Sequence, residues 1–149
     1  MLEIMIGAIL AGVLVVALRR ARFERVLRFW ARALFVAAAI YVGFVLVGGA
    51  PTQWLLIEVG GLLLFTTLAV LGLKYSPWVL ASAWFAHIAW DSLLHSQSTA
   101  FVPQWYPPLC IGFDLVVGAY IVFVWSRFRK HVPPNKALQA MSALPRRRG

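Results

Sequence analysis

The chain has 149 residues, of which 62% are hydrophobic and 13% are charged, and its formal net charge is +9. Soluble domains are about half apolar and about a quarter charged, so this composition excludes an ordinary soluble domain. A basic balance can indicate nucleic-acid binding, but the 14 Lys and Arg residues lie at the ends of apolar segments and in the C-terminal tail. That distribution is typical of charges that set membrane topology, and it argues against nucleic acid as a partner.

Five apolar segments follow one another along the chain, each long enough to cross the roughly 30 Å hydrocarbon core of a bilayer as a helix. We therefore predict an all-α, polytopic membrane protein with a bundle of about five transmembrane helices in residues 1–130 and a disordered cytoplasmic tail in residues 131–149. The predicted spans are residues 2–18, 29–47, 54–73, 78–95 and 109–126.

Basic residues predict the orientation of these spans. Six arginines lie between Arg19 and Arg32, Lys74 separates the third and fourth spans, and seven more basic residues follow from Arg127 onward. The other two connections, residues 48–53 and 96–108, contain no Lys or Arg. Because cytoplasmic loops are enriched in Lys and Arg, we expect a multi-pass protein of the bacterial inner membrane with its N-terminus outside and its C-terminus in the cytoplasm.

The tail contains the run Asn-Lys-Ala-Leu-Gln-Ala at residues 135–140. This run resembles the translated recombination site that ends many reading frames on integron gene cassettes. The resemblance implies that the last dozen or so residues reflect genetic context and carry no function.

Ionisable side chains inside the predicted spans are the candidate site. Glu58, Asp91 and Asp114 each lie about four or five residues from the predicted outer end of a span, which corresponds to a depth of about 6 to 7 Å at 1.5 Å per residue. His87 and His95 share the fourth span with Asp91. Ionisable groups at membrane depth are unfavourable and are functional candidates by default, so we expect a shared polar site that opens toward the outside.

The spacing His87-x-x-x-Asp91-x-x-x-His95 places three polar side chains on one helical face. The two histidines are eight residues apart, about 12 Å along the axis, so they are not expected to ligate one ion together. A metal is expected to take one histidine with Asp91, completed by Glu58 or Asp114. Imidazole with carboxylate suits zinc or iron. Cys110, one turn before Asp114, is a further candidate ligand.

Part of the chain, about residues 54–125, resembles an uncharacterised family of small bacterial and fungal integral membrane proteins that is catalogued as a domain of unknown function. The family motif is similar to His-x-x-Trp-Asp-x-x-His-His, a proline-containing loop and Cys-x-x-x-Asp, with a Glu near the start of the preceding span. Leu94 stands where the family has the first histidine of the terminal pair. The matching residues are Glu58, His87, Trp90, Asp91, His95, Pro103, Pro107, Cys110 and Asp114.

Three functions are compatible with such a site. The first is a membrane-embedded enzyme that acts on a lipid or small apolar molecule, with Asp91, His87 and Glu58 as catalytic residues and a metal that activates water. The second is a transporter or binder of protons or cations. The cytoplasmic half offers no matching acidic residue, so a transport path would need an oligomer or a large rearrangement.

The third function is non-catalytic assembly with other membrane proteins. In this hypothesis the polar side chains make contacts between helices and no metal is involved.

Overall fold

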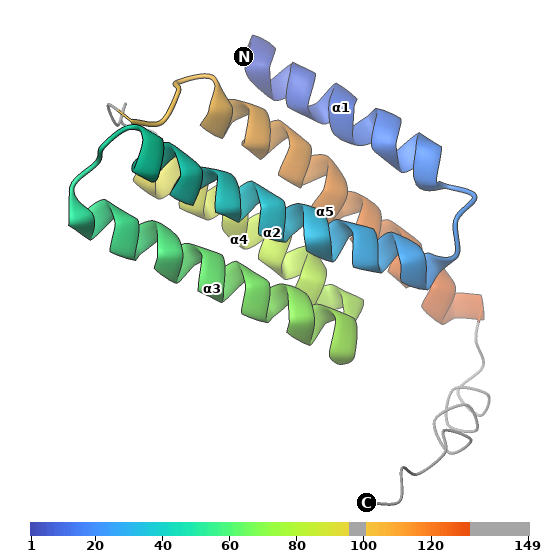
Figure 1. Cartoon of the computed structure of the whole chain (residues 1–149). Helices are drawn as coiled ribbons and strands as arrows, with labels where there is room; N and C mark the ends of the chain where they lie inside the picture. Colours follow the sequence, from blue (N-terminus) through green and yellow to red (C-terminus); the bar gives the residue numbers. More distant parts are fainter. Residues whose placement is uncertain (96–100, 132–149) are drawn as a thin grey trace, which may run out of the picture.

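The structure is a computed structural model that describes residues 1–95 and 101–131. Its regular secondary structure is entirely helical within these residues, which confirms the predicted all-α class with five helices (Figure 1). The helices are α1 (Leu2–Leu18), α2 (Phe23–Val47), α3 (Thr52–Lys74), α4 (Pro77–Leu94) and α5 (Tyr106–His131).

The helices run up and down in a bundle. α1 packs against α5, α5 against α4, α4 against α3, and α3 against α2, while α2 also touches α4 and α5. Figure 1 shows the N-terminus, the α2–α3 turn and the start of α5 at one end of the bundle. The α1–α2 turn, the α3–α4 turn and the last turns of α5 lie at the other end.

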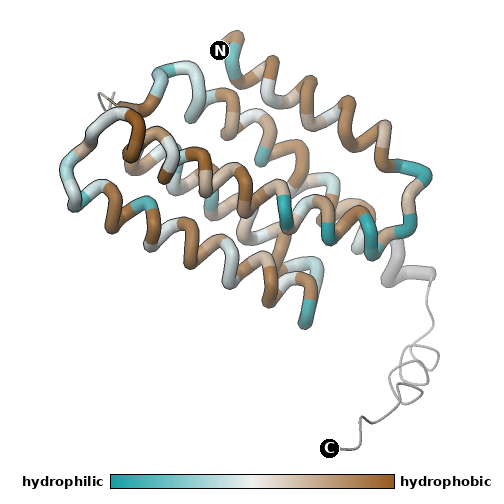
Figure 2. Tube along the Cα trace, in the orientation of Figure 1, coloured by the Kyte–Doolittle hydropathy of each residue, from teal (hydrophilic) through white to brown (hydrophobic). Residues whose placement is uncertain are grey.

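Basic residues gather at the second of these ends, which we call the basic end (Figure 2). It contains the arginines between Arg19 and Arg32, together with Lys74 and Arg127. The opposite end contains no Lys or Arg among its described residues. The helical connectivity therefore collects these basic residues on one side, as the sequence predicted.

Three helix boundaries differ from the prediction by three residues or more. α2 begins at Phe23 instead of residue 29, because arginine is a good helix former and the stretch from Arg25 to Arg28 continues the helix. α5 begins at Tyr106 instead of residue 109, because Pro107 and Pro108 fit a first turn in which N–H groups lack helical partners anyway. α5 also continues to His131, beyond its predicted end at residue 126.

Some sequence predictions fall outside the described residues. The disordered tail is one of these, apart from His131, which belongs to α5. The run at residues 135–140 and residues 96–100 of the predicted polar loop also lie outside the described part of the chain.

Within the described part of the chain, three helices are long and apolar enough to cross a membrane: α2, α3 and the segment Tyr106–Arg127 of α5. α1 is shorter, with 17 residues, and α4 contains His87 and Asp91 within its 18 residues. Large apolar side chains are exposed on every helix, a surface that marks contact with a membrane or with partners. Examples are Ile9, Val13, Val36, Leu46, Leu63, Val70, Leu93, Leu115 and Phe123.

The core toward the basic end is apolar and aromatic. Trp30 of α2 and Trp84 of α4 are fully buried, and their rings meet edge to face at 6.3 Å. Leu34, Leu80 and Ile121 fill the space around them. Apolar side chains therefore close the bundle on this side.

Glycines set the distance between α1 and α5. A side chain at Gly7 would collide with the Leu109 carbonyl of α5, and a side chain at Gly112 would collide with the Ile4 carbonyl of α1. The two glycines thus allow the backbones of α1 and α5 to approach closely, as small residues do between membrane helices.

Candidate functional site

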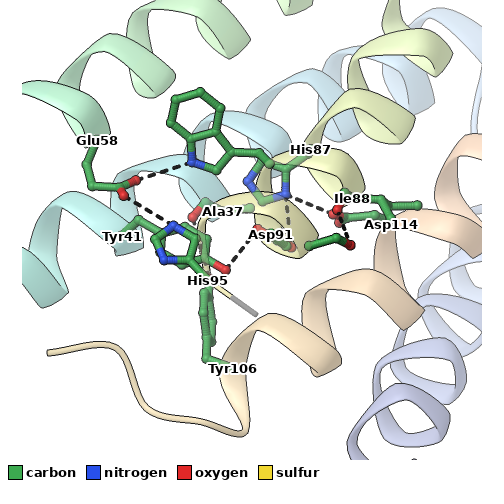
Figure 3. Close-up of polar contacts among 11 residues, drawn as sticks. Ala37, Tyr41, Glu58, His87, Ile88, Asp91, His95, Tyr106 and Asp114 are labelled. Carbon is green, nitrogen blue, oxygen red and sulfur yellow. Dashed lines mark hydrogen bonds and ion pairs between the residues drawn. The ribbon is translucent and has the colours of Figure 1, made fainter. Parts of the chain in front are cut away.

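The five predicted site residues come together between the helices (Figure 3), and their positions along α3, α4 and α5 place them in the half of the bundle away from the basic end. Glu58 comes from α3, His87 and Asp91 from α4, His95 from the C-cap of α4, and Asp114 from α5. All five are buried, and none exposes more than 5% of its surface. The i, i+4 spacing on α4 turns its three polar side chains inward between α3 and α5.

His87 forms the first group of contacts. Its Nδ1 lies 2.8 Å from Asp114 Oδ2 and 3.6 Å from Asp91 Oδ2. One ligand atom from each of these three residues can be chosen so that all lie within 4.8 Å of one another. His87, Asp91 and Asp114 therefore form a three-residue group with the donor atoms and the proximity of a metal site, which we call the His–Asp group.

Glu58 and His95 form the second group. His95 Nε2 lies 3.2 Å from Glu58 Oε1, which is within ion-pair distance. The indole Nε1 of Trp90 donates a hydrogen bond to Glu58 Oε2 at 3.4 Å. Gly61 leaves space for this indole, because a Cβ there would lie 2.6 Å from the Trp90 ring. Trp90, a tryptophan inside a predicted span, therefore serves the site directly.

Tyr41 joins the two groups, and sequence reasoning missed it. Its hydroxyl donates to Asp91 Oδ1 at 2.9 Å, while its ring stacks on His95 at 4.3 Å and 15°. Tyr41 lies six residues before the end of α2, about 9 Å along the axis. That position, at a depth similar to the carboxylates, was the signal in the sequence that could have identified it.

Cys110, the further candidate ligand, lies beside the His–Asp group and outside it. The thiol is free and buried, and it packs with Tyr41, Tyr106 and Val102. Its surroundings are those of a small apolar core residue.

The charge balance limits what the site can do. Three carboxylates are buried here, and the cationic groups that contact them in the described part of the chain are the imidazoles of His87 and His95. Asp91 Oδ2, Asp114 Oδ1 and His87 Nε2 have no hydrogen-bond partner among the described residues. Buried charges are strongly unfavourable unless they are paired. The centre therefore suits protons or a metal cation between its carboxylates.

A divalent cation would balance these charges simply. Asp91 and Asp114 would hold it as carboxylates and His87 as a neutral imidazole, so the charges of the ion and of the two aspartates would cancel. Zinc ligands at about 2.0 Å from the ion lie about 3.3 Å apart in a tetrahedron. The ligand atoms of the His–Asp group lie within 4.8 Å of one another, so they would have to move closer together to hold zinc.

Comparisons of the chain with protein-family models, with curated proteins and with solved structures give no match. The resemblance to a family of unknown function stays a prediction based on the residues that carry it. The assignment of the site depends on its geometry: a buried imidazole nitrogen that faces two aspartates contributed by two packed helices.

Proposed function

We propose that the chain is a five-span membrane protein whose polar centre binds zinc or iron through His87, Asp91 and Asp114 and acts on, or binds, a lipid or small apolar molecule. One observation carries the proposal. A fully buried imidazole lies within 3.6 Å of two buried carboxylates, and both aspartates have an oxygen that lacks a hydrogen-bond partner among the described residues. A cation satisfies these atoms better than apolar packing does.

The membrane part of the proposal includes α1 and α4 as spans. At 1.5 Å per residue they extend about 26 and 27 Å, slightly less than the roughly 30 Å hydrocarbon core. The basic end would lie in the cytoplasm of a bacterial cell and the polar centre in the outer half of its inner membrane. The hydropathy of α4 is lower than that of the apolar segments of α2, α3 and α5 because α4 contains His87 and Asp91. Both side chains face the bundle interior, as ionisable residues inside membranes do.

The centre has the composition of a reactive metal site. His87, Asp91 and Asp114 would supply three protein ligands, the number found in catalytic zinc sites. A bound metal would supply a Lewis acid. In this proposal His87 and Asp91 hold the ion, and Glu58, beside His95, accepts or returns a proton.

Packing favours a site over a transport path. Apolar side chains around Trp30 and Trp84 close the bundle between the polar centre and the basic end. That arrangement supports entry and exit of a ligand on one side of the membrane. Cation transport, the alternative function, would require these side chains to separate.

Metal content of the detergent-purified protein tests the centre. We expect near-stoichiometric zinc or iron in the wild type and a loss of that metal in His87→Ala and Asp114→Asn. His95→Asn is the matched control, because it removes the other buried histidine and should keep the metal. Absence of metal in the wild type after reconstitution with zinc and with iron would overturn the metal proposal.

Topology needs a separate experiment. Cys110 is the one cysteine of the chain, so Cys110→Ala gives a background without thiols. We expect a membrane-impermeant maleimide to label Pro51→Cys from outside intact cells and Ser76→Cys after lysis only. Labelling of both positions from outside, or of neither before lysis, would refute the proposed orientation.

A further inference from the structure

A lateral groove on the bundle surface is a second feature that the polar centre does not account for. It lies between α1, α2 and α5 and has a volume of about 520 Å³. α1 packs against α5 through Gly7 and Gly112, and this leaves a trough on α5 between α1 and α2. Most of the lining is apolar, including Leu10, Val36, Ile40, Leu109 and Phe113.

Two charged residues also line this groove. Arg32 is exposed and lies nine residues after Phe23, the first residue of α2, which is about 14 Å along the helix axis. Asp114 lies on the α5 wall and belongs to the His–Asp group. Arg32 is therefore a cation at one end of an apolar trough whose wall borders the polar centre.

The depth of Arg32 in the membrane indicates which kind of molecule fits the groove. If α2 spans the membrane, Arg32 lies where a long basic side chain can reach the headgroup region on the basic side. From Arg32 to Ile40 the groove follows α2 for eight residues, about 12 Å. One leaflet contributes about 15 Å of hydrocarbon. A single lipid chain from the leaflet on the basic side therefore matches the groove in polarity and in length.

We propose that the groove binds one hydrocarbon chain of an anionic phospholipid, with the lipid phosphate paired to Arg32. The positive guanidinium selects an anionic headgroup, and the apolar walls of α1, α2 and α5 hold the chain. The bound chain covers the side of α5 that contains Cys110 and Asp114, and so it separates the polar centre from bulk lipid. This inference depends on the membrane-spanning part of the proposed function and is independent of the metal.

Native mass spectrometry of the detergent-purified full-length chain tests the groove, with phosphatidylglycerol and phosphatidylcholine as probes. We expect one retained phosphatidylglycerol and a preference over phosphatidylcholine that falls about fivefold in Arg32→Gln, the effect of one basic residue at an anionic lipid surface. Arg28→Gln is the matched control. It is an exposed arginine of α2 that lies outside the groove, and it should leave the preference unchanged.

A second variant tests the apolar part of the groove. Val36→Trp fills it from a side chain that is 53% exposed and lies outside the buried core, so folding should be preserved. We expect this variant to lose retention of both lipids. If Arg28→Gln and Arg32→Gln lowered the preference for phosphatidylglycerol equally, general attraction by the basic end would explain that preference. This result would overturn the groove proposal. Unchanged retention in Val36→Trp would also overturn it.

Metal analysis of the same samples separates this inference from the proposed function. Arg32→Gln and Val36→Trp should keep their metal, because neither residue belongs to the His–Asp group. His87→Ala should keep its lipid. A wild-type protein that contains no metal and still retains phosphatidylglycerol would refute the metal proposal and support the groove proposal.

Discussion

Tyr41→Phe removes one hydroxyl from the polar centre and leaves the aromatic ring in place. The hydroxyl donates to Asp91 Oδ1 at 2.9 Å, and the ring stacks on His95 at 4.3 Å. A hydrogen bond to a charged group contributes about 1.5–3 kcal/mol. Groups that orient a metal ligand change metal affinity by about 10- to 100-fold. We therefore expect zinc affinity to fall about 10- to 100-fold.

Competition with a chromophoric chelator in detergent, at fixed pH, measures this change in affinity. Tyr106→Phe is the control, because its hydroxyl makes a long 3.5 Å contact with the Ala37 carbonyl and none with a ligand of the His–Asp group. We expect it to change the zinc affinity by less than about threefold, as suits a weak neutral hydrogen bond. A Tyr41→Phe affinity equal to that of Tyr106→Phe would refute the positioning of Asp91 by Tyr41.

Three further predictions follow from close contacts and from ligand chemistry. Gly112→Ala places a Cβ against the α1 backbone and should lower the free energy of unfolding by about 1–3 kcal/mol. Gly12→Ala has no atom within 4 Å of the added Cβ and should not lower the free energy of unfolding. Equal melting temperatures of Gly112→Ala and Gly12→Ala in detergent would contradict this reasoning. Gly61→Ala should lower stability by a similar amount because its Cβ meets the Trp90 ring, whereas Gly60→Ala faces open space and should not. Thermal melting of the two variants in detergent measures this difference. Metal affinity should fall on acidification, because the histidine and carboxylate ligands must lose their protons to bind. An affinity that is constant from pH 7 to 5 would argue against a histidine ligand.

Local patterns in the sequence were sufficient to predict the helices of this molecule and the ends at which they meet. Apolar runs predicted five helices, since helix formation in such segments depends on residues near one another in the chain. The alternation of basic and uncharged connections predicted which helix ends lie together. The i, i+4 spacing of His87, Asp91 and His95 predicted one polar face on α4, because helical periodicity alone fixes that relation.

Only the tertiary structure decided how these residues pair. The sequence left open whether Asp91 would be completed by Glu58 or by Asp114; in the structure Asp114 joins His87 and Asp91, and Glu58 pairs with His95. Packing between segments that are distant in the sequence determines how each helix is rotated and which helices it contacts. The Trp90 indole, which lies against Gly61, is an example. No local pattern encodes these contacts, and the same holds for the groove that α1 leaves beside α2. The position of Tyr41 in α2 indicated its depth, but only packing brought its hydroxyl to Asp91.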